Sequence, residues 1–223
     1  MAGSRTTLPD EPEARAGQPV ARLAASQLRR MRRIVDEAVR LAERGGFDAV
    51  RLRDVALASD VALGTLYKYF HSKEDILLFA LTEEVERLEA SVQTRGITGG
   101  SPVARLTHFF RRATSALVRR PDFARAVVRS IASGDPEHTA KVASFHLRMT
   151  RLILAALDGA ALDAGSPVPA DIGTEAQRQL ASVLQQVWFA SLVGWAGGLH
   201  PARVVAEQVE VAAGLLLGPP PEI

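Results

Sequence analysis

Apolar side chains recur at helical spacing along most of the chain. Between Met31 and Ala42 they stand at i, i+3, i+4 and i+7, and arginines and acids occupy the positions between them. No segment alternates apolar and polar residues over a length useful for a β-strand. The pattern therefore predicts an all-α fold with about nine helices.

Breaks in this pattern divide the chain into segments. Residues 1–23 are rich in proline, glycine and charge, which predicts a disordered N-terminal arm. The pair Gly45-Gly46 is expected to end a first helix that begins near Ala24. Ser72, with Asp75 three residues later, has the pattern of a capping box that begins a long helix. Further helices are predicted over 52–58, 63–70, 72–93, 102–119, 121–131, 137–157, 175–196 and 201–217, with a loop over 159–171.

The two short helices over 52–58 and 63–70, joined by a tight turn, have the form of a helix-turn-helix. Leu66 and Phe70 lie four residues apart and are expected to face inward as anchors. Thr65, Lys68 and Tyr69 would then face outward, with Tyr67 at the edge, where they could reach phosphates or base edges. Gly64 would let the backbone approach DNA closely. An ordinary pair of packed helices with half-buried tyrosines fits the same residues, and the pattern alone does not separate the two.

The run from Gly45 to Leu77 resembles the N-terminal domain of the TetR family of bacterial transcriptional regulators. The resemblance rests on six features at the family's spacing: Gly46-Phe47, Arg53-Asp54-Val55-Ala56, Val61, Gly64-Thr65-Leu66-Tyr67, Tyr69-Phe70 and Ser72-Lys73. It implies a DNA-binding domain over 24–71 and an effector-binding and dimerisation domain over 72–223. It also implies that DNA is contacted by Arg53, Gly64, Thr65, Tyr67, Lys68, Tyr69 and Lys73.

Four positions depart from the family's usual pattern. Arg51 replaces a capping threonine or serine, so the cap of the helix that follows is expected to be missing or replaced. Asp60 replaces the usual turn glycine, which aspartate tolerates because it accepts a left-handed backbone better than most residues. Ala62 replaces a serine before the recognition helix, and Leu63 stands at an often polar position. The fold is therefore expected to persist, while the operator sequence cannot be carried over from the family.

Charge is distributed unevenly along the chain, although the formal net charge is only +2. Up to Lys73 there are 13 lysines and arginines against 9 acids, a net of +4; from Glu74 there are 14 against 16, a net of −2. A basic first third suggests contact with a polyanion, although scatter in a short chain would give similar counts.

Several functions are disfavoured by what the sequence lacks. There is no cysteine, no apolar run of membrane-spanning length, and no catalytic or phosphate-binding motif. The five histidines are scattered without the spacing of a metal site. The polar N-terminus is unlike a signal peptide. We therefore expect a cytoplasmic protein that is not an enzyme, does not enter a membrane, and needs no cofactor or metal.

The C-terminal two thirds are expected to hold an apolar effector pocket and a dimer interface. Large apolar residues on the middle helices are the pocket candidates: Phe110, Phe123, Val127, Phe145, Met149, Ile153, Trp188 and Phe189. The segment QQVWFASLVGWAGG is apolar almost all round and the final helix adds further apolar residues, which indicates a four-helix interface between two copies. Its candidate residues are Leu192, Trp195, Val204, Val205 and Val209, with a core inside one chain as the alternative.

The segment VWFASLVGWAGGL also resembles regulators of steroid and cholesterol catabolism in actinobacteria. That resemblance implies an effector that is a steroid or an acyl-CoA thioester. Together these features predict a homodimeric repressor that a hydrophobic small molecule releases from a palindromic operator in double-stranded DNA. The alternative is a DNA-binding dimer without a small-molecule effector, controlled by its abundance or by a protein partner.

Overall fold

The computed structural model describes residues 17–159 and 173–218, with side chains from residue 26 onward. Within these ranges the chain forms nine α-helices and one short 3₁₀-helix, without a strand, which confirms the all-α fold. The helices are α1 Gly17–Ala49, α2 Leu52–Ala58, α3 Leu63–Leu66, α4 Lys73–Arg95, α5 Pro102–Val118, α6 Pro121–Ala132, η1 Pro136–His138, α7 Thr139–Asp158, α8 Glu175–Ala196 and α9 Arg203–Leu217. Residues 1–16 of the predicted arm and residues 160–171 of the predicted loop lie outside the described residues.

Helix α1 begins at Gly17, seven residues before the start predicted from the sequence. Pro19 lies in the first turn, where proline costs little because its missing N–H has no partner inside the helix. The segment from Val20 to Ala24 then contains alanine, arginine and leucine, which are good helix formers. The proline and glycine that suggested an arm are therefore compatible with the beginning of a helix.

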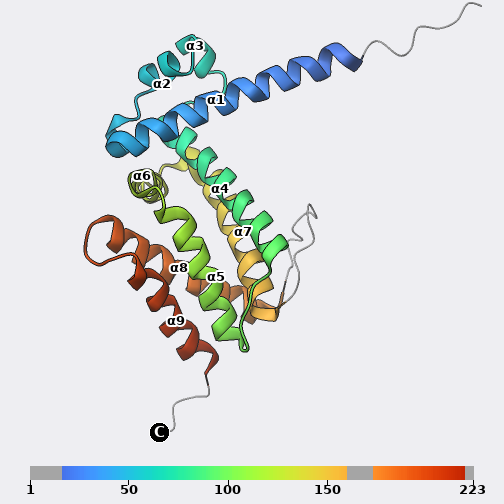
Figure 1. Ribbon diagram of the computed structural model, residues 1–223, viewed down its shortest axis with the longest axis vertical. Helices are drawn as coiled ribbons and strands as arrows, with labels where there is room; N and C mark the ends of the chain where they lie inside the picture. Colours follow the sequence, from blue (N-terminus) through green and yellow to red (C-terminus); the bar gives the residue numbers. More distant parts are fainter. Residues whose placement is uncertain (1–16, 160–172, 219–223) are drawn as a thin grey trace, which may run out of the picture.

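Helices α1, α2 and α3 form a small head with its own core, at the upper end of the molecule in Figure 1. The core faces are the fully buried Ile34 and Ala38 of α1, Val55 of α2 and Leu66 of α3. The helical path of α1 breaks at Gly45 and Gly46, as predicted, because Gly46 adopts a φ of 68° that residues with a Cβ rarely take. This break directs the chain into α2.

Helix α4 is the connection between the head and the rest of the chain. It leaves the head and runs down beside α7 and α5 (Figure 1). The Ser72 Oγ accepts a hydrogen bond from the Asp75 N–H at 3.0 Å, so the predicted cap is present. In a regular capping box the Asp75 carboxylate would accept a hydrogen bond from the Ser72 N–H. Here it accepts one from the N–H of the preceding residue, His71, at 3.0 Å. Lys141 of α7 forms an ion pair with the same carboxylate.

Helices α5 to α9 form the body around a core rich in phenylalanine. The side chains of Phe109, Phe110 and Phe123 are at most 1% exposed. The head docks on the body chiefly through α1, which packs more extensively on α6 than on α4. Among the described helices, none is long and apolar enough to cross a membrane.

Candidate DNA-binding surface and effector cavity

The turn between α2 and α3 is tight and internally bonded. The Ser59 Oγ donates to the Val55 carbonyl at 2.7 Å, and the Val61 N–H donates to the Ala56 carbonyl at 3.0 Å. Asp60 has a φ of 52°, which confirms that it takes the left-handed place of the usual glycine. Neither Arg51 nor Ala62 caps the helix that follows it with its side chain, as predicted. The bonds within the turn therefore hold the two helices in place without these caps.

The recognition helix is shorter than predicted, because regular α-helix ends at Leu66. The next residues continue as a tighter turn, in which the Lys68 N–H donates to Thr65 and the Tyr69 N–H donates to Leu66. The predicted anchors are confirmed, since Leu66 and Phe70 are 0% and 1% exposed. The Phe70 ring also meets the Phe79 ring of α4 edge-on, with centroids 5.7 Å apart. The anchor of the head is thus also a contact to the connecting helix.

The predicted contact residues differ in how open they are. Arg53, Gly64, Lys68 and Tyr67 are exposed, and 47% of Tyr67 is open to solvent. Tyr69 is only partly exposed and packs against the core, so the two tyrosines exchange the places that the sequence predicted for them. The tightening after Leu66 accounts for this change, because it turns the following side chains away from ideal α-helical positions. Thr65 is also half-buried.

Gly64 has no packing reason to be glycine. A Cβ added there would find no atom of the chain within 4 Å, and the residue is exposed. The missing side chain therefore leaves room for something outside the chain, which agrees with a close approach of DNA to the backbone.

Lys73 is bound within the chain. Its ammonium lies 3.7 Å from the centre of the Phe47 ring, donates to the Phe47 carbonyl at 3.3 Å, and is 3.9 Å from an Asp48 oxygen. Arg129 of α6 lies 4.2 Å from the same ring and 3.1 Å from the other Asp48 oxygen. Sequence reasoning missed this junction because its members are far apart in the chain. It joins the end of α1 to both α4 and α6.

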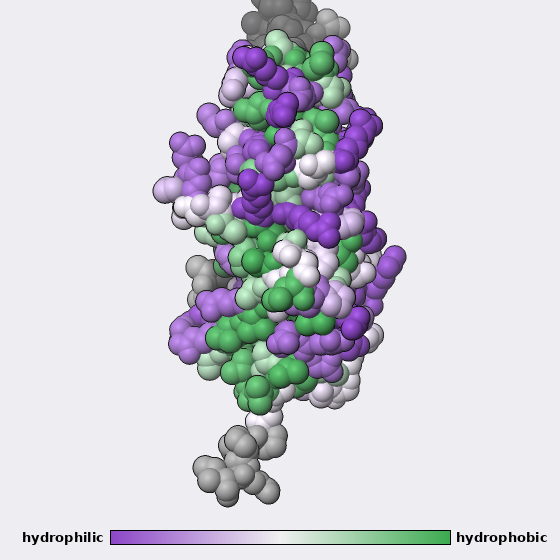
Figure 2. Space-filling view, turned by 90° about the vertical axis from the view of Figure 1, so that its left-hand side faces the viewer, coloured by the Kyte–Doolittle hydropathy of each residue, from purple (hydrophilic) through white to green (hydrophobic). Residues whose placement is uncertain are grey.

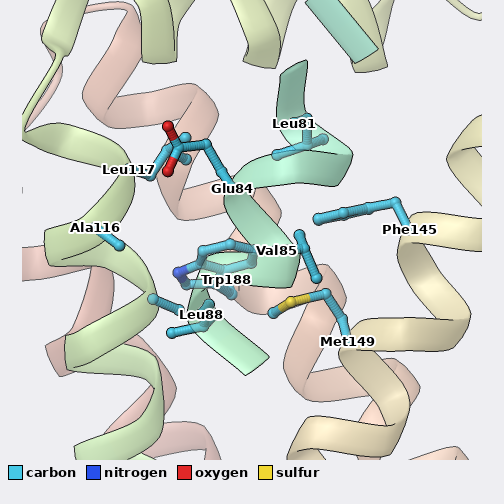
Figure 3. A pocket seen from close by; sticks show the side chains of 10 residues that line it. Leu81, Glu84, Val85, Leu88, Ala116, Leu117, Phe145, Met149 and Trp188 are labelled. Carbon is cyan, nitrogen blue, oxygen red and sulfur yellow. The ribbon is translucent and has the colours of Figure 1, made fainter. Parts of the chain in front are cut away.

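An apolar cavity lies inside the body between four helices (Figure 3). Val85 and Leu88 of α4 face it together with Trp188 of α8, while Phe145 and Met149 of α7 lie on the other side. The full lining is Leu81, Glu84, Val85, Leu88, Ala113, Ala116, Leu117, Phe145, Met149 and Trp188. Its volume is about 30 Å³, room for about two water molecules. In this state the cavity is too small for an effector molecule.

Three of the eight pocket candidates line the cavity: Phe145, Met149 and Trp188. Phe110, Phe123, Val127 and Ile153 are instead buried core residues outside its lining, and Phe189 is only partly buried. The Phe110 ring supports Trp188 from behind, with centroids 5.9 Å apart. Sequence reasoning took its pocket candidates from later helices and did not include the α4 residues that line the cavity.

Glu84 is the one charged residue in this lining. Its carboxylate is paired with Arg87 at 2.5 Å and with Arg120 at 3.5 Å. Arg120, between α5 and α6, also lies 3.0 Å from Glu43 of α1. A single guanidinium therefore connects the cavity wall with the head.

The proposed dimer residues need a correction. Leu192, Trp195, Val205 and Val209 are between 0% and 8% exposed in the single chain, and Val204 is half-buried. They pack between α8, α9 and the rest of the body. These residues therefore belong to the core of a single chain and are not available to a partner. Other apolar side chains of α8, α9 and their connection are exposed instead: Val183, Val193, Leu199, Val211, Leu215, Leu216 and Leu217. Figure 2 views the molecule from the side on which α9 lies in Figure 1, and hydrophobic surface gathers over the lower half of that face.

Comparisons with known proteins agree with this architecture. The family model "Bacterial regulatory proteins, tetR family" matches residues 34–79, and "Tetracyclin repressor-like, C-terminal domain" matches residues 99–216. The chain is 32% identical over 199 residues to the HTH-type transcriptional repressor KstR of Mycolicibacterium smegmatis, covering 86% of this chain and 89% of that one. The chain therefore belongs to the TetR family of bacterial regulatory proteins, and it is a transcriptional repressor of that type.

Solved structures show the same fold. A TetR transcriptional regulator from Rhodococcus sp. RHA1 superposes with a TM-score of 0.73 at 23% identity, covering 86% of this chain and 98% of that one. FadR of Thermus thermophilus, solved with lauroyl-CoA, gives a TM-score of 0.63 at 24% identity and covers 84% and 93%. At this identity the likeness concerns the fold.

Proposed function

We propose that the chain acts as a homodimer that binds a palindromic operator through two recognition helices and is released by a hydrophobic effector. The observation that carries the proposal is that α4, whose N-terminus adjoins the helix-turn-helix, supplies Leu81, Glu84, Val85 and Leu88 to the cavity wall. A molecule that enlarges the cavity must therefore press on the same helix that positions the head.

The proposed DNA contacts are Arg53, Gly64, Thr65, Tyr67, Lys68, Tyr69 and Lys73. The exposed Lys68 and Arg53 supply charge for phosphates, and Tyr67 and Gly64 form the open surface beside them. Lys73 would act through the Phe47 junction, which orients the beginning of α4. Two such surfaces must stand about 34 Å apart to enter successive major grooves.

The proposed dimer surface is the exposed apolar face of α8 and α9. Monomeric soluble proteins rarely expose large contiguous apolar patches. Val183 and Val193 of α8 and Val211 of α9 are 41%, 43% and 59% exposed. A second copy related by a two-fold axis would cover this face with the same face of its own.

The proposed effector is a hydrophobic small molecule, and the resemblance to steroid-catabolism regulators suggests a steroid or an acyl-CoA thioester. Ligand pockets usually have volumes of ~300–1,000 Å³, whereas this cavity measures about 30 Å³. The effector would bind a wider conformation of the body and shift the population away from the DNA-binding arrangement. The proposed site of action is the cytoplasm, where the operator DNA is found.

The small cavity also favours a second candidate, a DNA-binding dimer without an effector. Two measurements separate the candidates. The first is thermal unfolding with a panel of steroids, acyl-CoA thioesters and fatty acids. The second is fluorescence anisotropy on DNA identified by protection mapping upstream of the gene that encodes the chain. A ligand that raises the melting temperature and lowers DNA affinity supports the proposal; DNA binding that no apolar ligand alters supports the second candidate.

A matched pair of variants tests the DNA surface. Lys68→Ala should weaken operator binding and reduce its salt dependence, because a phosphate contact and its counterion release are lost. Arg203→Ala removes the same charge from an exposed position on α9, outside the head, and should leave binding unchanged. Equal operator affinity for both variants would contradict the assignment.

A further inference from the structure

Helix α1 extends well beyond the part of it that packs in the head. It begins at Gly17, whereas the first buried side chain among those described is Ile34. At 1.5 Å per residue, the turns between these two positions span about 25 Å. Figure 1 shows this part of α1 running past α3 at the upper end of the molecule, away from the body. The projecting part of α1, residues 17–33, therefore lies beside the surface that is proposed to meet DNA.

The projecting part of α1 is strongly basic. From Gly17 to Val35 the sequence contains five arginines and no acid, and the first acid of the helix is Asp36. Four of these arginines lie within residues 29–33. Like charges that are three or four residues apart on one helix repel each other. A polyanion placed along this part of the helix would relieve that repulsion.

Three of the four arginines are available to a partner. Arg29 and Arg33 are exposed and Arg30 is half-buried, and within the part of the chain that the structure describes none of them forms an ion pair or a side-chain hydrogen bond. Arg32 differs, because its charge opposes the burial that raises the pKa of Glu83, which places it on the α4 side. Arg29 and Arg33 are four residues apart, so the two open guanidinium groups share one face of the helix.

The projecting part of α1 points away from the proposed dimer surface. In Figure 1, α9 lies at the left of the body and the N-terminal end of α1 extends to the right. In the proposed dimer the partner covers the exposed face of α8 and α9, so the two projecting helices point outward. Each then follows the duplex beyond the half-site that its own head occupies. At 3.4 Å per base pair, about 25 Å of helix corresponds to roughly seven base pairs.

We infer that Arg29 and Arg33 of α1 bind phosphates of the DNA that flanks the palindrome. The inference rests on the proposed function and extends its DNA surface to a segment outside the helix-turn-helix. The family model begins at residue 34, so the projecting part of α1 also lies outside the domain that this model describes. Guanidinium groups bind phosphates strongly, and phosphate contacts carry no base readout. The flanks therefore add affinity whatever their sequence.

Two duplexes test the inference. The short one ends with the palindrome, and the long one adds about ten base pairs of arbitrary sequence on each side, more than the ~25 Å that the projecting helix spans. Fluorescence anisotropy measures the affinity of the chain for each duplex over a series of salt concentrations. The wild-type chain should bind the long duplex about tenfold or more tightly at low salt, and this advantage should shrink as salt rises, because the contacts release counterions.

Arg29→Gln combined with Arg33→Gln should remove the advantage of the long duplex. Four phosphate contacts are then lost from a dimer, so the slope of log affinity against log salt on the long duplex should fall by roughly three to four. Binding to the short duplex should remain that of the wild type. Glutamine forms helices about as well as arginine, so circular dichroism should show the same helix content.

The control is Arg40→Gln combined with Arg44→Gln, which removes the same charge from the same helix. Both residues are exposed and lie about three helical turns further along α1 than Arg29 and Arg33, and Arg40 is paired with Glu37. This variant should keep the wild-type preference for the long duplex.

Several results would overturn the inference. They are equal wild-type affinity for the two duplexes, equal losses in the two double variants, and a loss in the first variant that is as large on the short duplex as on the long one. Reduced binding to phosphatidylserine vesicles with unchanged binding to long DNA would assign the segment to a membrane surface instead. If the wild-type chain binds the palindrome but gains nothing from the flanks, only the inference fails. If it binds neither duplex, the proposed function fails.

Discussion

The helix-turn-helix and the apolar cavity are built in opposite ways. In the head, one stretch of seven residues from Gly64 to Phe70 contains both the buried anchors, Leu66 and Phe70, and the exposed positions beside them. The cavity instead draws its lining from α4, α5, α7 and α8, whose residues range from Leu81 to Trp188. The head is thus a local structure, and the cavity exists only where distant helices meet.

This contrast gives the two regions different mechanical properties. The anchors of the head are fully packed, so the head is expected to move as a unit. The cavity is small and lies on the less extensively packed side of α4, so we expect it to widen more easily than the head. Helix α4 belongs to both regions, which lets a change in the soft region move the stiff one.

The largest effect is expected from Phe70→Ala, which removes a buried anchor of the head. Phe70 is 1% exposed and contacts the Phe79 ring, so its removal should cost about 3–5 kcal/mol of unfolding free energy and abolish DNA binding. Tyr67→Ala, three residues away and exposed, should change stability by less than about 0.5 kcal/mol while weakening DNA binding. Urea unfolding and DNA titrations measure both. Comparable stability losses in the two variants would break the distinction between anchor and contact.

Ala116→Leu places a larger side chain in the lining of the cavity. The larger side chain should narrow the cavity and weaken effector binding about tenfold or more, which corresponds to about 1.4 kcal/mol of binding free energy. Because Ala116 lies outside the head and is not a proposed DNA contact, operator affinity without effector should remain that of the wild type. Calorimetry and anisotropy measure the two quantities. Unchanged effector binding would place the ligand elsewhere.

Arg120→Gln tests the connection between the two regions. The variant loses the contacts to Glu43 of the head and Glu84 of the cavity wall, at a cost of less than about 1 kcal/mol of stability because the pairs are partly exposed. The coupling between effector and operator should fall by about 0.5–2 kcal/mol. It is measured as the ratio of operator affinities with and without saturating ligand. Arg125→Gln, which removes a pair within α6 and a contact to the Trp195 ring but none to the head, should keep the full ratio.

The smallest effect concerns Glu83, which lies on α4 near α1. Burial raises its pKa above the usual 4.5. An acid with a raised folded-state pKa destabilises the fold above that value, and the penalty disappears as the pH falls below 4.5 because both states are then protonated. Glu83→Gln should therefore be slightly more stable than wild type at pH 7 and equal to it near pH 3.5. A variant less stable than wild type at pH 7 would show that the pair with Arg87 outweighs burial.

The contrast between the regions also explains which features could be predicted from the sequence. The helices, the turn at Asp60 and the anchors Leu66 and Phe70 depend on neighbouring residues, so local patterns revealed them. The exchange of roles between Tyr67 and Tyr69 escaped prediction, because it depends on a tightening of the backbone after Leu66 that residue types do not specify.

The cavity and the dimer surface could be predicted only in part. Phe145, Met149 and Trp188 were identified by size, but size does not distinguish a lining residue from a core residue such as Phe123. Apolar helices likewise hide which of their faces packs within the chain. Leu192 and Val211 are both apolar, yet the first is 1% exposed and the second 59%. These assignments require the tertiary arrangement.

The central claim is that the effector acts by moving the heads through α4, and the distance between the heads tests it most directly. The chain contains no cysteine, so Leu57→Cys on α2, at a position 83% exposed, can carry a single spin label in each subunit. Pulsed electron spin resonance then measures the label-to-label distance in the proposed dimer, on operator DNA and with lauroyl-CoA or any other probe shown to release DNA. The account predicts a single distance on DNA that shifts when the probe binds. An unchanged distance distribution with a bound probe that nevertheless releases DNA would contradict it.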